Sequence, residues 1–294
     1  MQKRFLFFLS VLFAMTFCFV YANPTPINAK GFYVQGVELY NQAKYEEAVK
    51  SLDTAIELNN EYKEAYLKKG MALYWLRNYQ ESAPCFDKVI SLDDKCIEAY
   101  KYKGLDLYYL RDAKSAILYF DKMIELDPNN FEGYDNKGMC LLRTGEYIEV
   151  IKNIDRSIIL KSDNYFSYNI KGVALYNLRK YEEATKSYEM AVRLAPNLSD
   201  ILVNNGMAYL MLGKYDDAIE YLNQAIIKKD TNAEAYKFLG YCYSAKNNIN
   251  EAIKNLKKSI EIDPSIKSRI KSDEENTTFL DKVKHDNMYK ALFK

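Results

Sequence analysis

Apolar and polar positions repeat along this chain with a period of 34 residues, from residue 29 to about residue 266. Each period holds one glycine in the same place: Gly36, Gly70, Gly104, Gly138, Gly172, Gly206 and Gly240. A large apolar residue stands four residues before each glycine, and a leucine or tyrosine stands three residues after it. This three-to-four spacing places the side chains on one face of a helix. The first half of every period is therefore predicted to be helical.

A second helical pattern follows a short polar break in each period. With the glycine numbered as position 8, the units begin at residues 29, 63, 97, 131, 165, 199 and 233. Position 17 is usually tyrosine, position 20 is mostly small, and position 24 is always large, as in Leu52, Phe86 and Tyr188. Pro128, Pro196 and Pro264 come just after the second pattern, where proline helps to end a helix. The glycine and the small position 20 allow close helix approach, so each unit is predicted to be a helical hairpin.

The repeated positions resemble the signature of the tetratricopeptide repeat family. The best single match to this signature is the unit with Gly206, Tyr209, Ala218, Leu222 and Ala225. The resemblance covers residues 29–266 and implies an all-α fold, a right-handed α-solenoid of seven stacked hairpins. Residues 267–294 are expected to form a helical cap over the last unit, with a short ligand motif for a partner as the alternative.

The resemblance also implies a binding groove lined by positions 2, 5, 9, 12 and 13 of the first helices. In the first three units the candidate groove residues are Tyr33, Tyr40, Leu67, Met71, Tyr74, Trp75, Lys101, Tyr108 and Tyr109. In units four to six they are Asp135, Met139, Arg143, Asn169, Tyr176, Asn177, Met207 and Met211. Trp75 and Tyr109 are expected to face a partner, whereas the position-12 tyrosines either do so or pack between helices. Position 9 is never asparagine, so the family's clamp for a C-terminal carboxylate is not expected.

Composition and motifs argue against several other functions. The chain has 41 Lys and Arg against 40 Asp and Glu, so no excess of positive charge favours nucleic acid. It has a single histidine, His285, and no cysteine or histidine spacing typical of zinc, no phosphate loop and no Gly-x-Ser-x-Gly motif. We therefore expect no catalytic residues, cofactor or metal. Cys85, Cys96, Cys140 and Cys242 are expected to be unpaired thiols, because two of them occupy small packing positions.

The N-terminus has the composition of an export signal. Lys3 and Arg4 precede an apolar run over residues 5–22, and Val20 and Ala22 fit a small-x-small cleavage rule. Residues 1–22 are predicted to be a signal peptide, with an uncleaved membrane anchor as the alternative. Residues 23–28 form a short linker. Because the basic residues come first, the repeats are expected outside the cytoplasm, periplasmic or secreted.

These features predict a non-catalytic scaffold that binds a peptide or helix of a partner protein in its groove. Two alternatives remain open at this point: an envelope assembly factor that acts by self-association or membrane tethering, and a regulatory subunit of an envelope enzyme.

Overall fold

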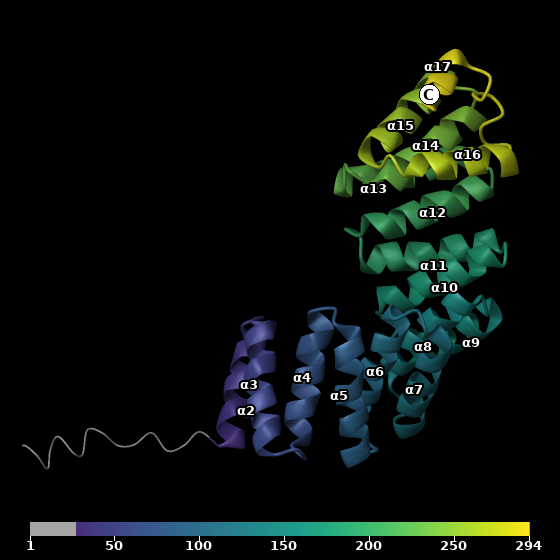
Figure 1. Cartoon of the computed structure of the whole chain (residues 1–294). Helices are drawn as coiled ribbons and strands as arrows, with labels where there is room; N and C mark the ends of the chain where they lie inside the picture. The colour runs from purple at the N-terminus through teal and green to yellow at the C-terminus, as the bar shows by residue number, and fades with distance from the viewer. Residues whose placement is uncertain (1–27, 294) are drawn as a thin grey trace, which may run out of the picture. The chain divides into compact units, whose positions relative to one another are not determined.

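The structure is a computed structural model of the chain, and it describes residues 28–293 (Figure 1). The predicted signal segment, residues 1–22, lies outside the described residues, as does the linker up to residue 27. Residues 28–293 form sixteen α-helices and no strand, which confirms the predicted all-α class. The helices of residues 28–293 group into two compact bodies, which meet between residues 119 and 120, within α7 (Ala113–Leu126).

In the N-terminal body, consecutive helices pack against one another in chain order. The helices are α2 (Ala29–Asn41), α3 (Tyr45–Leu58), α4 (Lys63–Trp75), α5 (Tyr79–Leu92) and α6 (Ile97–Tyr109). From α2 to α6, each helix contacts its neighbour in this series, and α4 also contacts α2 and α6. First helices therefore neighbour one another as well as their own second helices.

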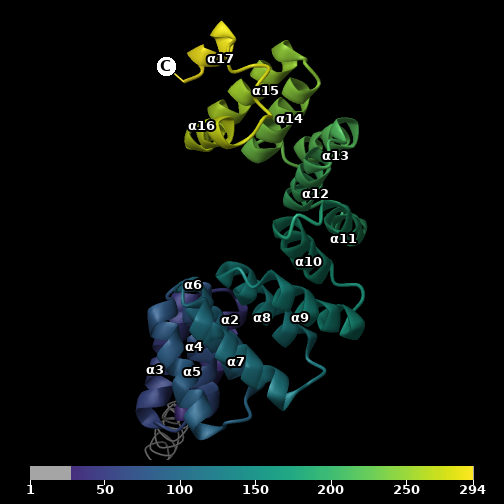
Figure 2. The same cartoon turned by 90° about the vertical axis from the view of Figure 1, so that its right-hand side faces the viewer.

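The C-terminal body continues the same arrangement (Figure 2). Its repeat helices are α8 (Phe131–Thr144), α9 (Tyr147–Leu160), α10 (Tyr165–Asn177), α11 (Tyr181–Leu194), α12 (Ser199–Met211), α13 (Tyr215–Lys228), α14 (Ala233–Ala245) and α15 (Ile249–Ile262). Two further helices, α16 (Ile266–Asn276) and α17 (Asn287–Ala291), complete the body. The first helix of every unit begins at the residue where the 34-residue period places the start of that unit.

The turn inside each hairpin has one conserved geometry. Position 15 lies in the left-handed region in every unit, with φ between 58° and 82° at Ala43, Arg77, Arg111, Gly145, Arg179, Gly213 and Asn247. The N–H of position 16 donates to the carbonyl oxygen of position 11 in all seven turns, at 2.8–3.0 Å. This bond closes a Schellman-type helix end, which satisfies a carbonyl that the helix leaves unpaired. Glycine favours this conformation, yet it occupies only two of the seven sites.

Within a hairpin, the side chain at position 24 lies directly on the glycine at position 8. A Cβ added to Gly36, Gly138 or Gly240 would lie 2.6 Å from a side-chain carbon of Leu52, Ile154 or Leu256. At Gly172 the corresponding distance to Tyr188 is 2.5 Å. One large residue therefore fills the space above each of these glycines.

Between units, a lysine on the first helix pairs with an aspartate on the preceding second helix. In the N-terminal body Lys69 pairs with Asp53 at 2.5 Å and Lys103 with Asp87 at 2.6 Å. In the C-terminal body Lys137 pairs with Asp121 and Lys171 with Asp155, both at 2.6 Å. The lysine is at position 7 and the acid at position 25 in each case. The series ends where Asn205 replaces the lysine and Glu189 accepts a hydrogen bond from Tyr209 instead.

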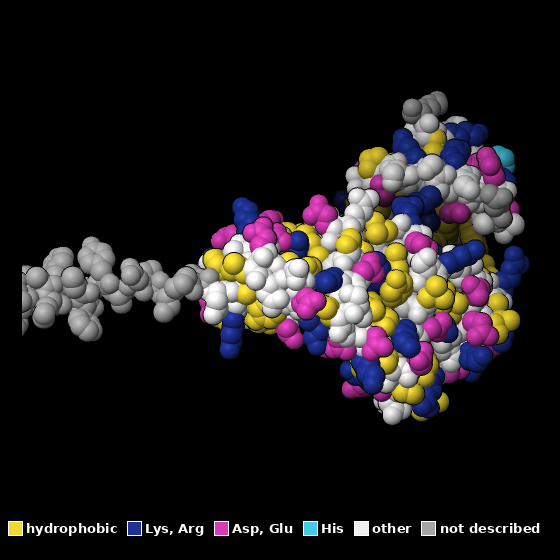
Figure 3. All heavy atoms as spheres, turned by 60° about the horizontal axis from the view of Figure 1, so that its bottom comes forward, with side chains coloured by type: hydrophobic (Ala, Val, Ile, Leu, Met, Phe, Trp, Pro, Cys, Tyr) yellow, Lys and Arg dark blue, Asp and Glu magenta, His cyan; other side chains and the backbone are white. Residues whose placement is uncertain are grey.

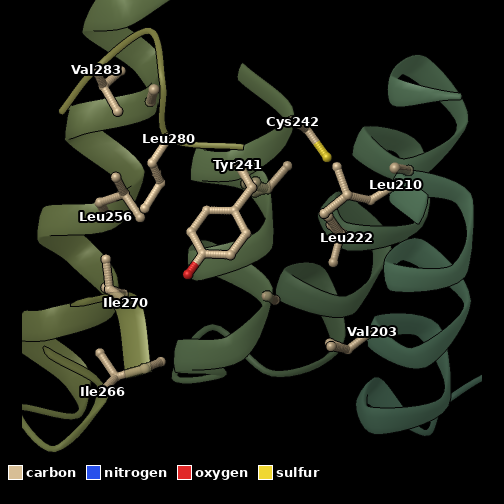
Figure 4. Packing of buried hydrophobic residues seen from close by; sticks show 14 of the residues in the cluster. Val203, Leu210, Leu222, Tyr241, Cys242, Leu256, Ile266, Ile270, Leu280 and Val283 are labelled. Carbon is tan, nitrogen blue, oxygen red and sulfur yellow. The ribbon is translucent and has the colours of Figure 1, made fainter. Parts of the chain in front are cut away.

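Residues 266–293 fold onto the last hairpin and bury its apolar end (Figure 4). Ile266, Ile270, Leu280 and Val283 are fully buried in one cluster with Leu256 of α15. In Figure 4, Tyr241 of α14 lies between these residues and the side chains of Cys242, Leu210 and Leu222. The segment thus has the position expected of a cap. Within residues 28–293, no helix combines the length and apolar character needed to span a membrane.

Replacing a position-8 glycine by alanine is expected to destabilise its hairpin. In Gly206→Ala the new Cβ would lie 2.7 Å from Leu222 Cγ, and overpacking of this kind costs about 1–3 kcal/mol. Urea unfolding followed by circular dichroism measures the effect. The double variant Gly206→Ala/Leu222→Ala should lose less stability than the sum of the two single variants, because the substitutions share one contact. Full additivity would contradict this account.

A buried carboxyl group is expected to make the N-terminal body less stable as the pH rises. Asp106 is completely buried, and neither carboxyl oxygen has a hydrogen-bond partner within residues 28–293. Burial raises the pKa of Asp106 to about 7, and Ser82 and Lys103 offset only part of this effect. In the unfolded chain, an aspartate has a pKa of about 3.9. The folded state therefore binds the proton more tightly, so the free energy of unfolding falls as the pH rises from about 4 to about 7.

The variant Asp106→Ala is the matched control, because alanine occupies the same position in Ala72, Ala174 and Ala208. Urea midpoints at several pH values between 5 and 8 are the measurement. As the pH rises from 5 to 8, we expect the free energy of unfolding of the wild type to fall relative to that of Asp106→Ala, by about 1 kcal/mol or more. A difference that is independent of pH would show that Asp106 does not titrate in this range.

Candidate functional site

The first helices of the second and third units end in exposed aromatic residues. Trp75 at the end of α4 is 52% exposed, and Tyr109 at the end of α6 is 48% exposed. Both are at position 13, where the hairpin turn follows. Positions 12 and 17 add further tyrosines beside them. We call this group the aromatic face, and it comprises Tyr40, Tyr45, Tyr74, Trp75, Tyr79 and Tyr109.

Each exposed ring of the aromatic face is supported by a tyrosine of the preceding unit. Trp75 stacks on Tyr45, with ring centroids 6.4 Å apart and an interplanar angle of 16°. Tyr109 stacks on Tyr79, with centroids 4.8 Å apart and an angle of 10°. Both supporting tyrosines begin a second helix at position 17. The ring planes are therefore fixed by packing, although about half of each residue is open to solvent.

Tyr74 joins the two stacked pairs. Its ring meets Trp75 edge-on, with centroids 5.6 Å apart, and lies 6.0 Å from Tyr109. Burial raises the pKa of Tyr74 above its usual value, and the neighbouring Tyr109 raises it further. The Trp75 Nε1–H donates to Tyr40 Oη at 2.8 Å. The pair contacts and the hydrogen bond hold the face as one continuous surface of rings.

The other predicted groove residues of the N-terminal body have different surroundings. Tyr33 packs against Tyr62 with ring centroids 5.0 Å apart. Leu67 and Met71 are partly buried against the core formed by Phe86, Val89 and Ala99. The ammonium group of Lys101 lies 6.0 Å from the Tyr102 ring, and Tyr108 meets Tyr109 edge-on at 5.6 Å. The structure thus brings together Tyr40, Tyr74, Trp75, Tyr108 and Tyr109, while Leu67 and Met71 contribute largely to the core.

In the C-terminal body, the prediction that Asp135 presents its side chain to a partner is wrong. Asp135 is only 3% exposed. Its carboxylate accepts hydrogen bonds from Ser167 Oγ at 2.8 Å and from Asn164 Nδ2 at 2.6 Å. Burial raises the pKa of Asp135, and these hydrogen bonds oppose the rise. The residue at this position therefore fixes a junction between units.

The remaining predicted residues of the C-terminal body are spread over separate contacts. Asn169 Oδ1 accepts from Asn204 Nδ2 at 3.2 Å, and Asn177 Nδ2 donates to the carbonyl oxygen of Val173 at 2.8 Å. Met139 is half-buried and Arg143 is exposed. Tyr176, Met207 and Met211, in contrast, line one shared cavity.

This cavity, which we call the groove pocket, has a volume of about 330 Å³. Besides these three residues, its lining comprises Leu210, Lys237, Phe238, Tyr241, Asp273, Thr277 and Phe279. Lys237 is almost fully buried there, with its Nζ 2.9 Å from Glu234 and 3.5 Å from Asp273. Tyr241 Oη donates to Asp273 at 2.7 Å. Since the lysine is already paired with carboxylates, the open part of the pocket is mainly apolar and aromatic.

Sequence reasoning missed the residues that close the groove pocket. Phe238 is at position 6, which was not among the expected groove positions, and Asp273 and Phe279 belong to the cap. The 34-residue period ends before the cap, so it carried no signal for where those side chains would lie. Position 9 is aromatic in the last unit alone, at Tyr241, and this departure from the pattern was the signal that the last unit differs at this site.

The described residues offer little basis for metal or thiol chemistry. Within residues 28–293, no group of three His, Cys, Asp or Glu side chains is placed to hold a metal ion. The four cysteines in this part of the chain are unpaired. Burial raises the pKa of Cys85 to about 11 and those of Cys140 and Cys242 to about 12, so their reactive thiolate forms are disfavoured. On the face in Figure 3, acidic and basic side chains are interspersed.

Comparison with known proteins gives consistent results along the chain. Four family models described as tetratricopeptide repeat match residues 33–95, 119–152, 165–198 and 209–272. No curated protein matched the chain.

Three solved structures illustrate the similarity. MamA is 25% identical with a TM-score of 0.52, and the match covers 56% of this chain and 96% of MamA. YrrB, described as a TPR protein with an unusual peptide-binding site, is 22% identical with a TM-score of 0.54, covering 65% and 99%. PilW, described as a widely conserved type IV pilus biogenesis factor, is 18% identical with a TM-score of 0.64, covering 70% and 96%. The last two similarities concern the fold alone.

Removing the Asp135 carboxylate is expected to destabilise the C-terminal body. In Asp135→Ala, the buried Ser167 hydroxyl and the Asn164 amide each lose an acceptor, and leaving buried polar groups unpaired costs about 1–3 kcal/mol. Urea unfolding measures this loss. Asn177→Ala is the control, because the Asn177 side chain is exposed and bonds only within its own helix turn. Equal stability of Asp135→Ala and Asn177→Ala would contradict the assigned role.

Proposed function

Because the chain belongs to the tetratricopeptide repeat family, we propose that it is a non-catalytic adaptor that holds a segment of a partner protein along its first helices. Family and fold support the general role, a scaffold for protein interactions. The finer proposal concerns the surface that binds and the compartment in which binding occurs.

The observation that carries the proposal is the exposure of Trp75 and Tyr109 on a rigid support. Large aromatic side chains dominate the energetics of protein interfaces, and they cost little conformational entropy when their rings are already fixed. Here stacking on Tyr45 and Tyr79 fixes both rings before any partner arrives. A surface that served only the internal packing of the repeats would not leave these two residues about half exposed.

The groove pocket supports the same proposal in the C-terminal body. It offers an apolar and aromatic cavity between first helices, large enough for one or two side chains of a bound segment. Peptide-binding grooves commonly combine an extended contact surface with pockets for individual side chains. The description of YrrB as having a peptide-binding site is in line with a segment bound by repeats of this kind.

We further propose that the repeats act outside the cytoplasm. The support is the N-terminal sequence, in which Lys3 and Arg4 precede the apolar residues 5–22 and a small-x-small site at Val20 and Ala22. Cleavage after residue 22 would release the repeats, whereas retention would tether them to a membrane. Mass determination of the protein purified from its native envelope distinguishes the two forms.

Affinity capture with residues 23–294 as bait tests the proposed function. The bait, the variant Trp75→Ala/Tyr109→Ala and a control variant are incubated with solubilised envelope, and bound proteins are quantified by mass spectrometry. We expect a partner that the wild type retains and the double variant loses by about tenfold or more, which corresponds to about 1.4 kcal/mol.

The control variant is Ile148→Ala/Ile227→Ala, which removes two side chains that are 72% and 80% exposed and belong to α9 and α13 of the C-terminal body. Circular dichroism confirms that all three baits are folded. A partner lost equally from both variants would indicate a general apolar attraction. A partner retained by both would exclude the aromatic face as its binding site.

A further inference from the structure

The aromatic face presents hydrogen-bond donors next to its exposed rings. Tyr40 Oη accepts the Trp75 Nε1–H at 2.8 Å, so the tyrosine's own O–H remains oriented by that bond and can donate to a ligand. The Lys68 ammonium group lies 4.7 Å from the centroid of the same Tyr40 ring and adds a second donor. The surface therefore combines ring faces with donors, and it suits a ligand that offers carbonyl oxygens and flat apolar groups.

The exposed rings also recur at a defined interval. Trp75 and Tyr109 occupy the same position in consecutive units, on first helices α4 and α6 that contact each other. Packed helices of this kind lie about 8–10 Å apart. A polyproline II helix presents the same edge every three residues, which corresponds to about 9.3 Å. The pitch of the ligand is therefore close to the spacing expected for neighbouring first helices.

We propose that the aromatic face binds a proline-rich segment of a partner protein in the polyproline II conformation. This inference rests on the proposed function and specifies the partner. Proline rings lie against Trp75 and Tyr109, and carbonyl oxygens of the segment where it continues past Trp75 toward α2 accept from Tyr40 and Lys68. Proline has no N–H group, so its segments need donors and aromatic surfaces rather than acceptors. The preformed conformation of the ligand also lowers the entropic cost of binding.

A bound amphipathic helix fits this part of the chain less well. Such a helix needs a continuous apolar trough for side chains spaced three and four residues apart. The apolar side chains that would form the floor, Leu67 and Met71, are instead partly buried against Phe86 and its neighbours. What remains open is a row of fixed rings with hydroxyl groups at their edges.

The single tryptophan of the chain provides a direct assay. A ten-residue polyproline peptide is titrated into the protein from residue 23 onward, which contains every described helix, and the emission of Trp75 is followed. The matched probe is a ten-residue Gly-Ser peptide, and a third probe is a soluble oligosaccharide, which also stacks on aromatic rings. We expect a saturable change with polyproline and none with the other two probes.

Variants are compared by the anisotropy of a fluorescein-labelled polyproline peptide, which needs no tryptophan. Tyr109→Ala is expected to weaken binding about tenfold, and Tyr40→Phe, which keeps the ring and removes the hydroxyl donor, about threefold to tenfold. Ile148→Ala is the control and should bind as the wild type does. Equal affinity for polyproline and Gly-Ser peptides, or equal affinity of all variants, would overturn the proposal.

The two proposals fail in distinguishable ways. If the protein captures a partner through Trp75 and Tyr109 but does not bind polyproline, the adaptor function is supported and the proline-rich ligand is refuted. A response to the oligosaccharide alone would indicate that the aromatic face binds a glycan, and it would also refute the proline-rich ligand.

Discussion

The contact between the glycine at position 8 and the large side chain at position 24 sets the geometry on which the other features depend. It fixes how closely the two helices of a hairpin approach, because a single methyl group on Gly206 would come within 2.7 Å of Leu222. The contact recurs with leucine, isoleucine, phenylalanine or tyrosine as the large residue. The repeated feature is thus the contact itself, in which one bulky side chain fills the gap above a glycine, and the identity of the bulky residue varies. Once the gap is filled in this way, the ends of both helices and the turn between them have fixed places.

Neighbouring units are joined by contacts that vary more along the chain. The pairs Lys69–Asp53 and Lys171–Asp155 have the same geometry, although they lie in different bodies. Their lysine side chains are about three-quarters buried and the aspartates about half exposed, so each pair contributes modestly. Apolar packing supplies most of the stability, and the ion pairs favour one register of a lysine-bearing helix over another. The loss of the pattern at Asn205 shows that stacking continues without it.

Helix packing also explains why aromatic residues gather at the ends of α4 and α6. Position 13 of one unit lies next to position 17 of the unit before it, so Trp75 meets Tyr45 and Tyr109 meets Tyr79. The corresponding residues at the next step along the chain are Arg143 and Ala113, and neither is aromatic. A shared backbone arrangement therefore supports an aromatic surface in one part of the chain and a different surface in another. Selection of the side chains at these two positions is sufficient to change what a unit can bind.

The sequence by itself determined the fold class, the start of each unit and the prominence of Trp75 and Tyr109, because a strict 34-residue period reports helix faces directly. It could not identify Asp135 as buried, since position 5 is open in some units and covered by Asn164 and Ser167 in this one. Nor could it place Asp273 and Phe279 beside Phe238 in the groove pocket. Those contacts join the repeats to a segment outside the period, and only tertiary packing decides where such a segment lies. A periodic pattern specifies what every unit shares, whereas the depth at which one side chain is buried depends on the particular neighbours that cover it.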